Sequence, residues 1–268
     1  MTLVQAVGVP DYEVVFAEAK TSDYCLVIPV INEGERIGKL LATMRTKGID
    51  RLCDIILCDG GSTDDSLEPA ELRNLGVRVL LLKKGAGRLS SQLRCAYHFA
   101  LELSYKGVLT IDGNNKDDPS PIPAFIEKLK EGYDFVQASR FISGGEAVNT
   151  PMSRTLAIRL LHAPLLSLAS GFHWTDTTQG FRAYSAKLLQ DPRVAVFRDV
   201  FKNYELLAYL SYRAPKLGFR CIEMPSRRIY PMGQVPTKIS FIKGNAEVFK
   251  VLMKACFGNY NPEQEKVS

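Results

Sequence analysis

The chain has 268 residues, 46% of them hydrophobic and 24% charged, a composition typical of a globular protein with a sizeable core. The formal net charge is +5, and the lysines and arginines are scattered, which argues against nucleic acid as a partner and suits an anionic substrate or lipid surface. Six cysteines without a C-x-x-C pair and only three histidines argue against a zinc site and favour a reduced, cytoplasmic location.

Residues 1–22 lack a basic segment followed by an apolar core, so we expect no signal peptide and treat them as an N-terminal extension. No run of about 18 uncharged apolar residues occurs, so we expect no membrane span. The most apolar stretch, residues 155–172, is interrupted by Arg159, His162 and Pro164. It favours a buried amphipathic helix, and an interfacial helix that lies on a membrane is the alternative.

Strand and helix patterns alternate through the first half of the chain. Helical spacing of apolar residues predicts helices, and continuous apolar runs predict strands that are buried on both faces. The expected strands are residues 24–31, 54–59, 77–83, 108–112 and 133–140, and the expected helices are 33–46, 65–76, 89–107 and 121–132. Such alternation implies an α/β fold with a mainly parallel central sheet flanked by helices.

The second half of the chain is less regular. It favours helices at 152–170, 199–213 and 238–256, an irregular segment at 174–185 and a strand at 219–229. No segment resembles an interdomain linker, so we expect a single domain over residues 23–257, followed by a frayed tail at 258–268.

Polar turns follow the predicted strands. In parallel sheets, ligands bind beyond the carboxyl ends of the strands. Here those ends carry Asn32 and Glu33, the turn at 59–62, the glycine-containing segment 84–88 and the acidic turn at 112–118. So many polar turns on one edge point to a binding site there.

The acidic turn places Asp112 and Asn114 two residues apart, so an extended chain would direct both to the same side. Two oxygen ligands at that spacing suit a hard cation that also holds phosphate oxygens. The alternative is an ordinary turn, because aspartate, asparagine and glycine are turn formers.

Two glycine-containing turns have both a binding and a structural interpretation. Asp59 is suited to accept hydrogen bonds from a base or ribose, while Ser62 could simply cap a helix. The segment 83–92, which includes Gly85, places cations and glycines before a long helix, as an anion site does, although it is not a Walker A sequence.

Taken together, these motifs resemble the inverting family-two glycosyltransferases with the GT-A fold, and most closely their dolichyl- and polyprenyl-phosphate sugar synthases. The resemblance spans roughly residues 23–240 and rests on motifs that occur in the family's order. They are VIPVINEGERI (27–37), LCDGGSTDDS (57–66), TIDGNNKDDP (110–119), ASRFISGG (138–145), MSRTLAIRLL (152–161) and DTTQGFRAYS (176–185).

The resemblance implies a Rossmann-like GT-A fold and a role for each matched residue. The implied nucleotide-binding residues are Pro29, Asn32, Glu33, Asp59, Gly85 and Asp112. The implied residues for the acceptor phosphate are Arg140, Arg154, Gln179 and Lys238. The implied catalytic residues are Asp112, Lys116, Arg140, Asp176 and Arg182, and the implied metal ligands are Asp112 and Asn114.

The chain departs from the family pattern at the metal site. Asn114 replaces the second aspartate of the D-x-D motif, and Lys116 replaces a glutamine. Of the family's late R-x-x-G-x-S-K motif, we match only the lysine to a residue of this chain, Lys238. Two interpretations follow for the cofactor: Mg²⁺ or Mn²⁺ is held by Asp112 with Asp117 or Asp118, or Lys116 supplies the positive charge itself.

The implied activity is transfer of a sugar, with inversion, from a UDP or GDP sugar to an acceptor, expected to be a polyprenyl phosphate such as undecaprenyl or dolichyl phosphate. An anionic acceptor needs arginines to position it, whereas a hydroxyl acceptor needs a base, for which Asp117, Asp118 or Asp176 are candidates. Peripheral association with the inner face of the membrane fits such an acceptor. The alternatives are a sugar-1-phosphate nucleotidylyltransferase and a non-catalytic nucleotide-sugar-binding protein.

Overall fold

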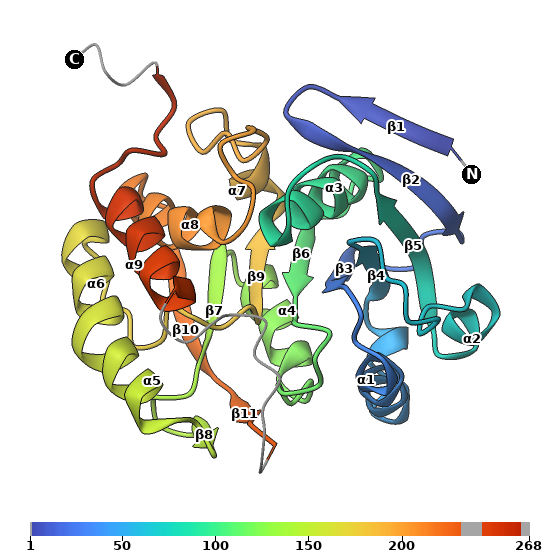
Figure 1. The fold of residues 1–268 in the computed structure, drawn as a ribbon, viewed down its shortest axis with the longest axis horizontal. Coiled ribbons are helices and arrows are strands. Elements are labelled where there is room, and N and C mark those ends of the chain that lie inside the picture. The colour runs from blue at the N-terminus through green and yellow to red at the C-terminus, as the bar shows by residue number, and fades with distance from the viewer. Residues whose placement is uncertain (1, 232–242, 264–268) are drawn as a thin grey trace.

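The computed structural model describes residues 2–231 and 243–263 (Figure 1). Its centre is a nine-stranded sheet with the order β1-β2-β5-β4-β3-β6-β9-β7-β10. The strands are β1 (Thr2–Ala6), β2 (Val9–Ala17), β3 (Tyr24–Val30), β4 (Asp54–Asp59), β5 (Val77–Lys83), β6 (Gly107–Thr110), β7 (Phe135–Ser139), β9 (Arg182–Ser185) and β10 (Cys221–Pro225). A separate two-stranded sheet pairs β8 (Glu146–Val148) with β11 (Arg227–Ile229).

The expected parallel arrangement is present in the centre of the sheet. β3 pairs in parallel with β4 and β6, β4 pairs in parallel with β5, and β10 pairs in parallel with β7. β2 and β9 run against their neighbours. The carboxyl ends of the parallel strands therefore meet at one edge, where the polar turns follow them.

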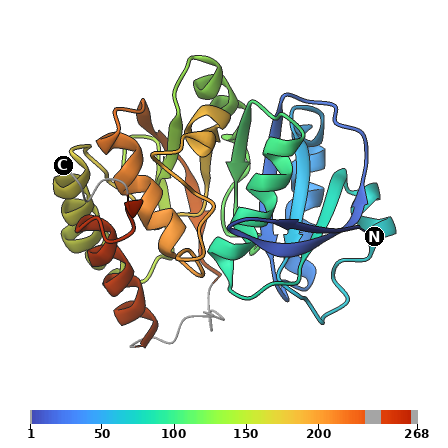
Figure 2. The ribbon, with the colours of Figure 1, turned by 90° about the horizontal axis from the view of Figure 1, so that it is seen from above.

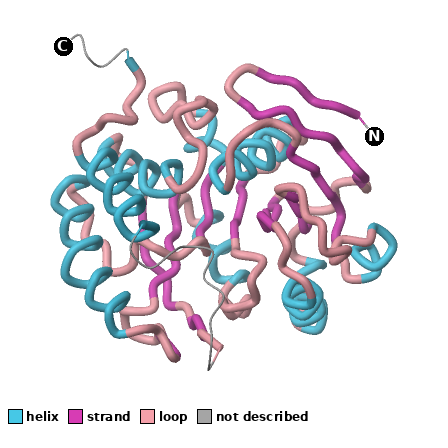
Figure 3. The backbone as a smooth tube through the Cα atoms, viewed as in Figure 1, coloured by secondary structure: helices cyan, strands magenta, loops and turns pink. Residues whose placement is uncertain are grey.

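Helices cover both faces of the sheet (Figures 1 and 2). They are α1 (Glu35–Thr46), α2 (Pro69–Asn74), α3 (Leu89–Glu102), α4 (Ile122–Lys130), α5 (Met152–Ala157), α6 (Ala163–Ser170), α7 (Ala186–Gln190), α8 (Glu205–Lys216) and α9 (Lys243–Cys256), with a short 3-10 turn η1 (Ile49–Arg51) and a π-helical segment η2 (Ile158–His162). Figure 3 shows the same path coloured by secondary structure.

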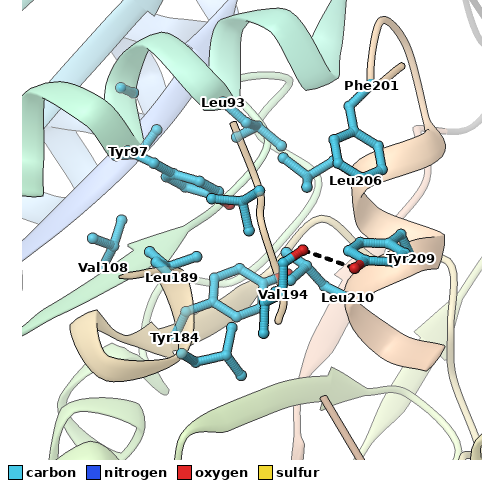
Figure 4. Packing of buried hydrophobic residues seen from close by; sticks show 14 of the residues in the cluster. Leu93, Tyr97, Val108, Tyr184, Leu189, Val194, Phe201, Leu206, Tyr209 and Leu210 are labelled. Carbon is cyan, nitrogen blue, oxygen red and sulfur yellow. Dashed lines mark hydrogen bonds between the residues drawn. The ribbon is translucent and has the colours of Figure 1, made fainter. Parts of the chain in front are cut away.

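Side chains that alternate along each strand feed two hydrophobic cores. In β3, Cys25 and Val27 join the core under α3, α7, α8 and α9, and the intervening Leu26 and Ile28 join the core under α1, α2 and α4. The first core is rich in aromatic rings, and Tyr97, Tyr184 and Tyr209 lie within it (Figure 4). Burial on both faces explains why the central strands read as continuous apolar runs.

The N-terminal residues contain strands that the sequence analysis does not predict. β1 and β2 form an antiparallel pair, and β2 extends the main sheet by pairing with β5. Tyr12 and Phe16 of β2 are buried, while Asp11 and Ala17 are exposed. Tyr12 joins the core under α3 and Phe16 joins the core under α1 and α2, so β2 packs against both cores.

The second half differs from the expected elements in several places, and β8 and α7 are additional elements. The irregular segment 174–185 ends in β9, which lies between β6 and β7. The expected strand 219–229 is broken at Ser226, so β10 stays in the main sheet while β11 leaves it for β8. The expected helix 199–213 begins later, and α8 continues to Lys216 with Pro215 inside it.

Candidate functional site

The loops after β3 and β4 are tied to each other by Asn32. Its side-chain oxygen accepts a hydrogen bond from the backbone amide of Thr63 at 2.8 Å, and its backbone amide donates a hydrogen bond to Ser62 Oγ at 3.0 Å. Asn32 adopts a left-handed backbone with a φ of 49°, which asparagine tolerates better than most residues. Pro29 lies in β3 just before this loop, and the buried Glu33 accepts a hydrogen bond from Arg36 at 3.0 Å.

Asp59 orders the turn that follows β4. Its Oδ1 accepts hydrogen bonds from the amides of Gly61 at 3.1 Å and Ser62 at 2.9 Å, and from Ser62 Oγ at 2.7 Å. Asp59 is buried, so most of its acceptor capacity serves the loop itself. The alternative that Ser62 caps a helix is wrong, since the next helix, α2, begins only at Pro69 and Ser62 instead bonds to Asp59 within the turn. Any contact of Asp59 with a nucleoside stays a prediction.

Gln92 is a structural residue of this edge that the sequence analysis missed. It is buried on α3, and its side-chain amide donates to the carbonyl oxygens of Val30 and Cys58, each at 2.8 Å. These carbonyls lie at the carboxyl ends of the neighbouring strands β3 and β4, so Gln92 holds the two strand ends together. A glutamine in a helix gives no local signal of such a contact.

Gly85 packs against the N-terminal strands. Its amide donates to the Asp11 carbonyl at 2.9 Å, and a Cβ at this position would lie 2.9 Å from Cβ of Pro10. Close packing against β2 therefore explains why the position is a glycine. This geometry argues against a direct contact between Gly85 and a nucleotide.

Asp112 follows β6 and lies at the centre of a charged cluster. Nη2 of Arg228 donates to its Oδ2 at 3.1 Å, and Nη1 of the same guanidinium pairs with Asp117. Although burial lowers the pKa of Arg228, the carboxylates of Asp117 and Asp112 raise it above its ordinary value overall, so the guanidinium stays charged. The sequence analysis does not single out Arg228.

Asp117 belongs to a buried network. Its Oδ1 accepts a hydrogen bond from Gln179 Nε2 at 3.0 Å, and Gln179 Oε1 in turn accepts one from Ser226 Oγ at 3.0 Å. The predicted contact of Gln179 with an acceptor phosphate finds no support here, since its side chain is buried and already bonded at both ends. Asp118 caps its own turn by accepting from Ser120, at 3.0 Å from the amide and 2.6 Å from Oγ.

The residues present do not fit a divalent cation. Asn114 Oδ1 accepts the Lys116 amide at 3.2 Å, while its Nδ2 faces Asp112 Oδ2 at 3.5 Å. Within the described residues, no cluster of three or more histidine, cysteine, aspartate or glutamate side chains could hold a metal ion. The Arg228 guanidinium already neutralises Asp112, so a metal ion would have to compete with it.

Three cations surround the ring of Tyr230, which is another residue that the sequence analysis missed. Nζ of Lys116 lies 5.0 Å from the ring centroid, and the guanidinium carbons of Arg154 and Arg228 lie 5.5 Å and 5.7 Å from it. Arg154 Nη1 also donates to the Tyr230 hydroxyl at 2.8 Å. Burial, followed by the charge of Arg228, lowers the pKa of Lys116. This positive region beside Asp112 is suited to bind phosphate.

Arg140 and Asp176 form a buried ion pair. Nε and Nη2 of Arg140 donate to the two carboxylate oxygens of Asp176 at 2.7 Å and 3.0 Å, and Nη2 also donates to Thr178 Oγ1 at 2.9 Å. Both side chains are about 1% exposed or less. The pair fixes the end of β7 to the turn before β9, and it leaves Asp176 badly placed to act as a free base.

Arg182 lies in the interior, away from the cation cluster. Its guanidinium donates to the carbonyl oxygens of Gln179 at 2.9 Å, Thr177 at 3.0 Å and Leu207 at 2.7 Å. These contacts hold the 177–180 turn against α8, so the geometry points away from direct contact with a substrate. Lys238 lies outside the described residues.

Comparison with known proteins identifies the chain. Residues 25–192, more than half of the chain, match the family model described as glycosyl transferase family 2, and the chain belongs to this family. The protein is therefore a glycosyltransferase, as the resemblance implies.

Two relatives share most of their length with this chain. A dolichyl-phosphate hexose transferase of Haloferax volcanii is 29% identical over 87% of this chain and 94% of its own length. An undecaprenyl-phosphate mannosyltransferase of Micrococcus luteus is 28% identical over 74% of this chain and 80% of its own length.

Solved structures confirm the GT-A fold. Glucosyl-3-phosphoglycerate synthase of Mycobacterium tuberculosis, in complex with UDP, matches 89% of this chain and 81% of its own with a TM-score of 0.59 and 18% identity. The same enzyme with Mn²⁺, UDP-glucose and phosphoglyceric acid also gives a TM-score of 0.59, with 17% identity over 89% of this chain and 80% of its own. At these identities the likeness concerns the fold alone.

Proposed function

We propose that the protein transfers a sugar from a UDP or GDP sugar to a polyprenyl phosphate, with inversion at the anomeric carbon. The observation that carries this proposal is the cation cluster of Lys116, Arg154 and Arg228 beside Asp112, at the carboxyl edge of the sheet. Such a cluster stabilises the charge that the leaving diphosphate gains. The names of the two relatives support a lipid phosphate as the acceptor.

The reaction needs no strong base under this proposal. An oxygen of the acceptor phosphate, already ionised at neutral pH, forms the new bond to the anomeric carbon while the bond from that carbon to the nucleoside diphosphate breaks. The burial of Asp117 and Asp176 in ion pairs agrees with an acceptor that brings its own negative charge. An acceptor hydroxyl would instead have to lose a proton to a nearby base.

The helical stretch that starts at Met152 and includes Arg154 supports a lipid acceptor. It carries leucines and a methionine that point away from the core, with Leu160 and Met152 each 72% exposed and Leu168 85% exposed. Arg159 lies among them and is also exposed. An apolar face with cations, joined to the phosphate site by Arg154, suits the surface of an anionic membrane.

Peripheral attachment at the inner face of the membrane is part of this proposal. Within residues 2–231 and 243–263, none of the helices combines the length and the apolarity that a membrane crossing requires. The helices α5 and α6 lie together along the outside of the molecule (Figure 1). Their exposed residues would enter the lipid interface, which places Arg154 close to the headgroup level.

A transfer assay tests the proposal. The protein is incubated with a panel of UDP and GDP sugars and with polyprenyl phosphate in anionic vesicles, and sugar-linked lipid and free nucleoside diphosphate are measured. We expect equal amounts of both products. Pyrophosphate-dependent exchange would instead favour a nucleotidylyltransferase, and binding without turnover would favour a nucleotide-sugar-binding protein.

A further inference from the structure

Arg228 occupies a place that the metal-site prediction assigns to a divalent ion. Its guanidinium lies between the carboxylates of Asp112 and Asp117 and is hydrogen bonded to both. The side chains of Arg228 and Asp117 are 9% and 0% exposed, whereas that of Asp112 is 26% exposed. Of these three ionised side chains, Arg228 and Asp117 are thus buried, and Asp112 is partly exposed at the carboxyl edge of the sheet.

We propose that Arg228 is a resident cation that replaces the divalent metal and binds the donor diphosphate directly, an inference that rests on the proposed function. The Arg228 guanidinium has five N–H donors in a planar fork, of which two serve the carboxylates. Such a fork matches the oxygen geometry of phosphate, which a point charge does not. The other donors have no hydrogen-bond partner among the described residues.

The position of Arg228 is fixed by backbone pairing on both sides. Its strand β11 pairs in parallel with β8 on one side, with Arg228 opposite Ala147. On the other side, the Ile229 amide donates to the Lys116 carbonyl at 2.8 Å, and the Asp118 amide donates to the Arg227 carbonyl at 2.9 Å. Alternation along the strand then buries Arg228 and exposes its two neighbours.

The charges at the site favour an anion over a second cation. Asp112 and Asp117 are balanced by Arg228 and by Lys116, which lies on the same loop, and Arg154 adds a further positive charge beside Tyr230. A metal ion bound to Asp112 would lie next to the Arg228 guanidinium and be repelled by it. The same positive charges attract a diphosphate.

The alternative is a purely structural ion pair, in which Arg228 only neutralises the buried Asp117. That role needs one carboxylate, whereas Arg228 also bonds to the partly exposed Asp112. The two roles differ in what happens when the charge is removed. Without the guanidinium, Asp112 and Asp117 would be free to bind a cation, and a diphosphate would lose its partner.

The test measures metal and nucleotide binding separately in the intact protein. Uptake of Mn²⁺ alone is followed by the loss of the electron paramagnetic resonance signal of free Mn²⁺. Binding of UDP and GDP is followed by calorimetric titration, once with EDTA and once with Mn²⁺. The variants are Arg228→Gln and the matched control Arg227→Gln, whose exposed side chain pairs with the exposed Glu146.

For the unaltered protein and Arg227→Gln, we expect no Mn²⁺ uptake. We also expect the dissociation constants for UDP and GDP measured with EDTA to lie within about twofold of those measured with Mn²⁺. For Arg228→Gln, we expect a loss of about tenfold or more in nucleotide binding with EDTA, which Mn²⁺ partly restores, together with measurable Mn²⁺ uptake. Circular dichroism checks that this variant is folded.

Two results would overturn the inference. One is Mn²⁺ uptake by the unaltered protein together with a tenfold or greater loss of nucleotide binding in EDTA. The other is nucleotide binding by Arg228→Gln that matches the unaltered protein in EDTA. If Arg228→Gln does not fold, Mn²⁺ uptake and nucleotide binding by the unaltered protein alone decide whether the inference holds. If UDP and GDP do not bind under any condition, the proposed function fails, and the Mn²⁺ titration still decides whether Arg228 excludes a metal.

Discussion

The carboxylate of Asp112 lies in the space that a side chain at position 180 would need. A Cβ on Gly180 would be 2.2 Å from Oδ1 of Asp112, far closer than two such atoms can approach. The carbonyl of Gly180 also accepts a hydrogen bond from Thr110 Oγ1 at 2.7 Å, which holds the turn against β6. The glycine of the 176–185 motif thus shapes the site by making room for Asp112.

Replacing Gly180 with alanine should therefore displace Asp112. The φ of Gly180 lies outside the left-handed region, so an alanine meets a steric conflict with Asp112 and no backbone strain. We expect nucleoside diphosphate binding to weaken by about tenfold or more, measured by calorimetry. The control is Gly38→Ala in α1, where a Cβ meets open space and alanine should stabilise the helix by about 0.5–1 kcal/mol. Unchanged binding by Gly180→Ala would remove Asp112 from the site.

The Arg140–Asp176 pair should act mainly on stability. Removing one partner of a buried ion pair leaves the other charge uncompensated, so Asp176→Asn should lower the free energy of unfolding by about 3–5 kcal/mol. The double variant Arg140→Met with Asp176→Asn removes both charges and should recover part of that loss. Urea denaturation of the unaltered protein, Asp176→Asn and the double variant measures their free energies of unfolding. A cost below about 1 kcal/mol for Asp176→Asn would mean that the pair is not closed in solution.

His162 should make stability depend on pH. Burial lowers its pKa from the ordinary value of 6.5, so the unfolded chain takes up a proton at a higher pH than the folded protein does. Its contribution is complete above the unfolded pKa and is lost as the pH falls through the lower, folded pKa. We therefore expect the unfolding free energy of the unaltered protein to decline relative to His162→Gln as the pH is lowered from about 8 to 5. If the difference in unfolding free energy between the two proteins stays constant over this range, the burial of His162 is contradicted.

The exposed apolar face of the 152–170 stretch should carry membrane binding. Leu160→Glu places a charge in the centre of this face and should abolish flotation with anionic vesicles at low salt. Leu52 is a matched control, since it is 46% exposed but lies in the turn between α1 and β4, away from α5 and α6. Leu52→Glu should float as the unaltered protein does. Equal flotation of both variants would count against this face as the membrane surface.

The central strands could be predicted from the sequence because burial on both faces leaves a continuous apolar run. β3 and β4 are such strands, and their expected and observed limits agree within a residue. β9 could not be predicted in this way. Its four residues include Arg182 and Ser185, and it exists because β6 and β7 offer partners on both sides.

The candidate site could be predicted in part. The sequence singles out Asp112, Lys116 and Arg154, which lie around Arg228 and Tyr230. Arg228 itself depends on pairing with segments about 80 and 110 positions earlier in the chain, and no local pattern reports such contacts. Arg140 and Arg182 are among the site residues that the resemblance implies, but their roles depend on partners 36 and 25 positions later in the chain.

The most direct test of the account is the fate of the sugar when the protein is given a labelled nucleotide sugar and polyprenyl phosphate. The account predicts that the label moves to the lipid in an amount equal to the nucleoside diphosphate released, that nuclear magnetic resonance finds the opposite anomeric configuration in the product, and that Asp112→Ala produces none. A product with the donor's configuration, or full transfer by Asp112→Ala, would contradict it.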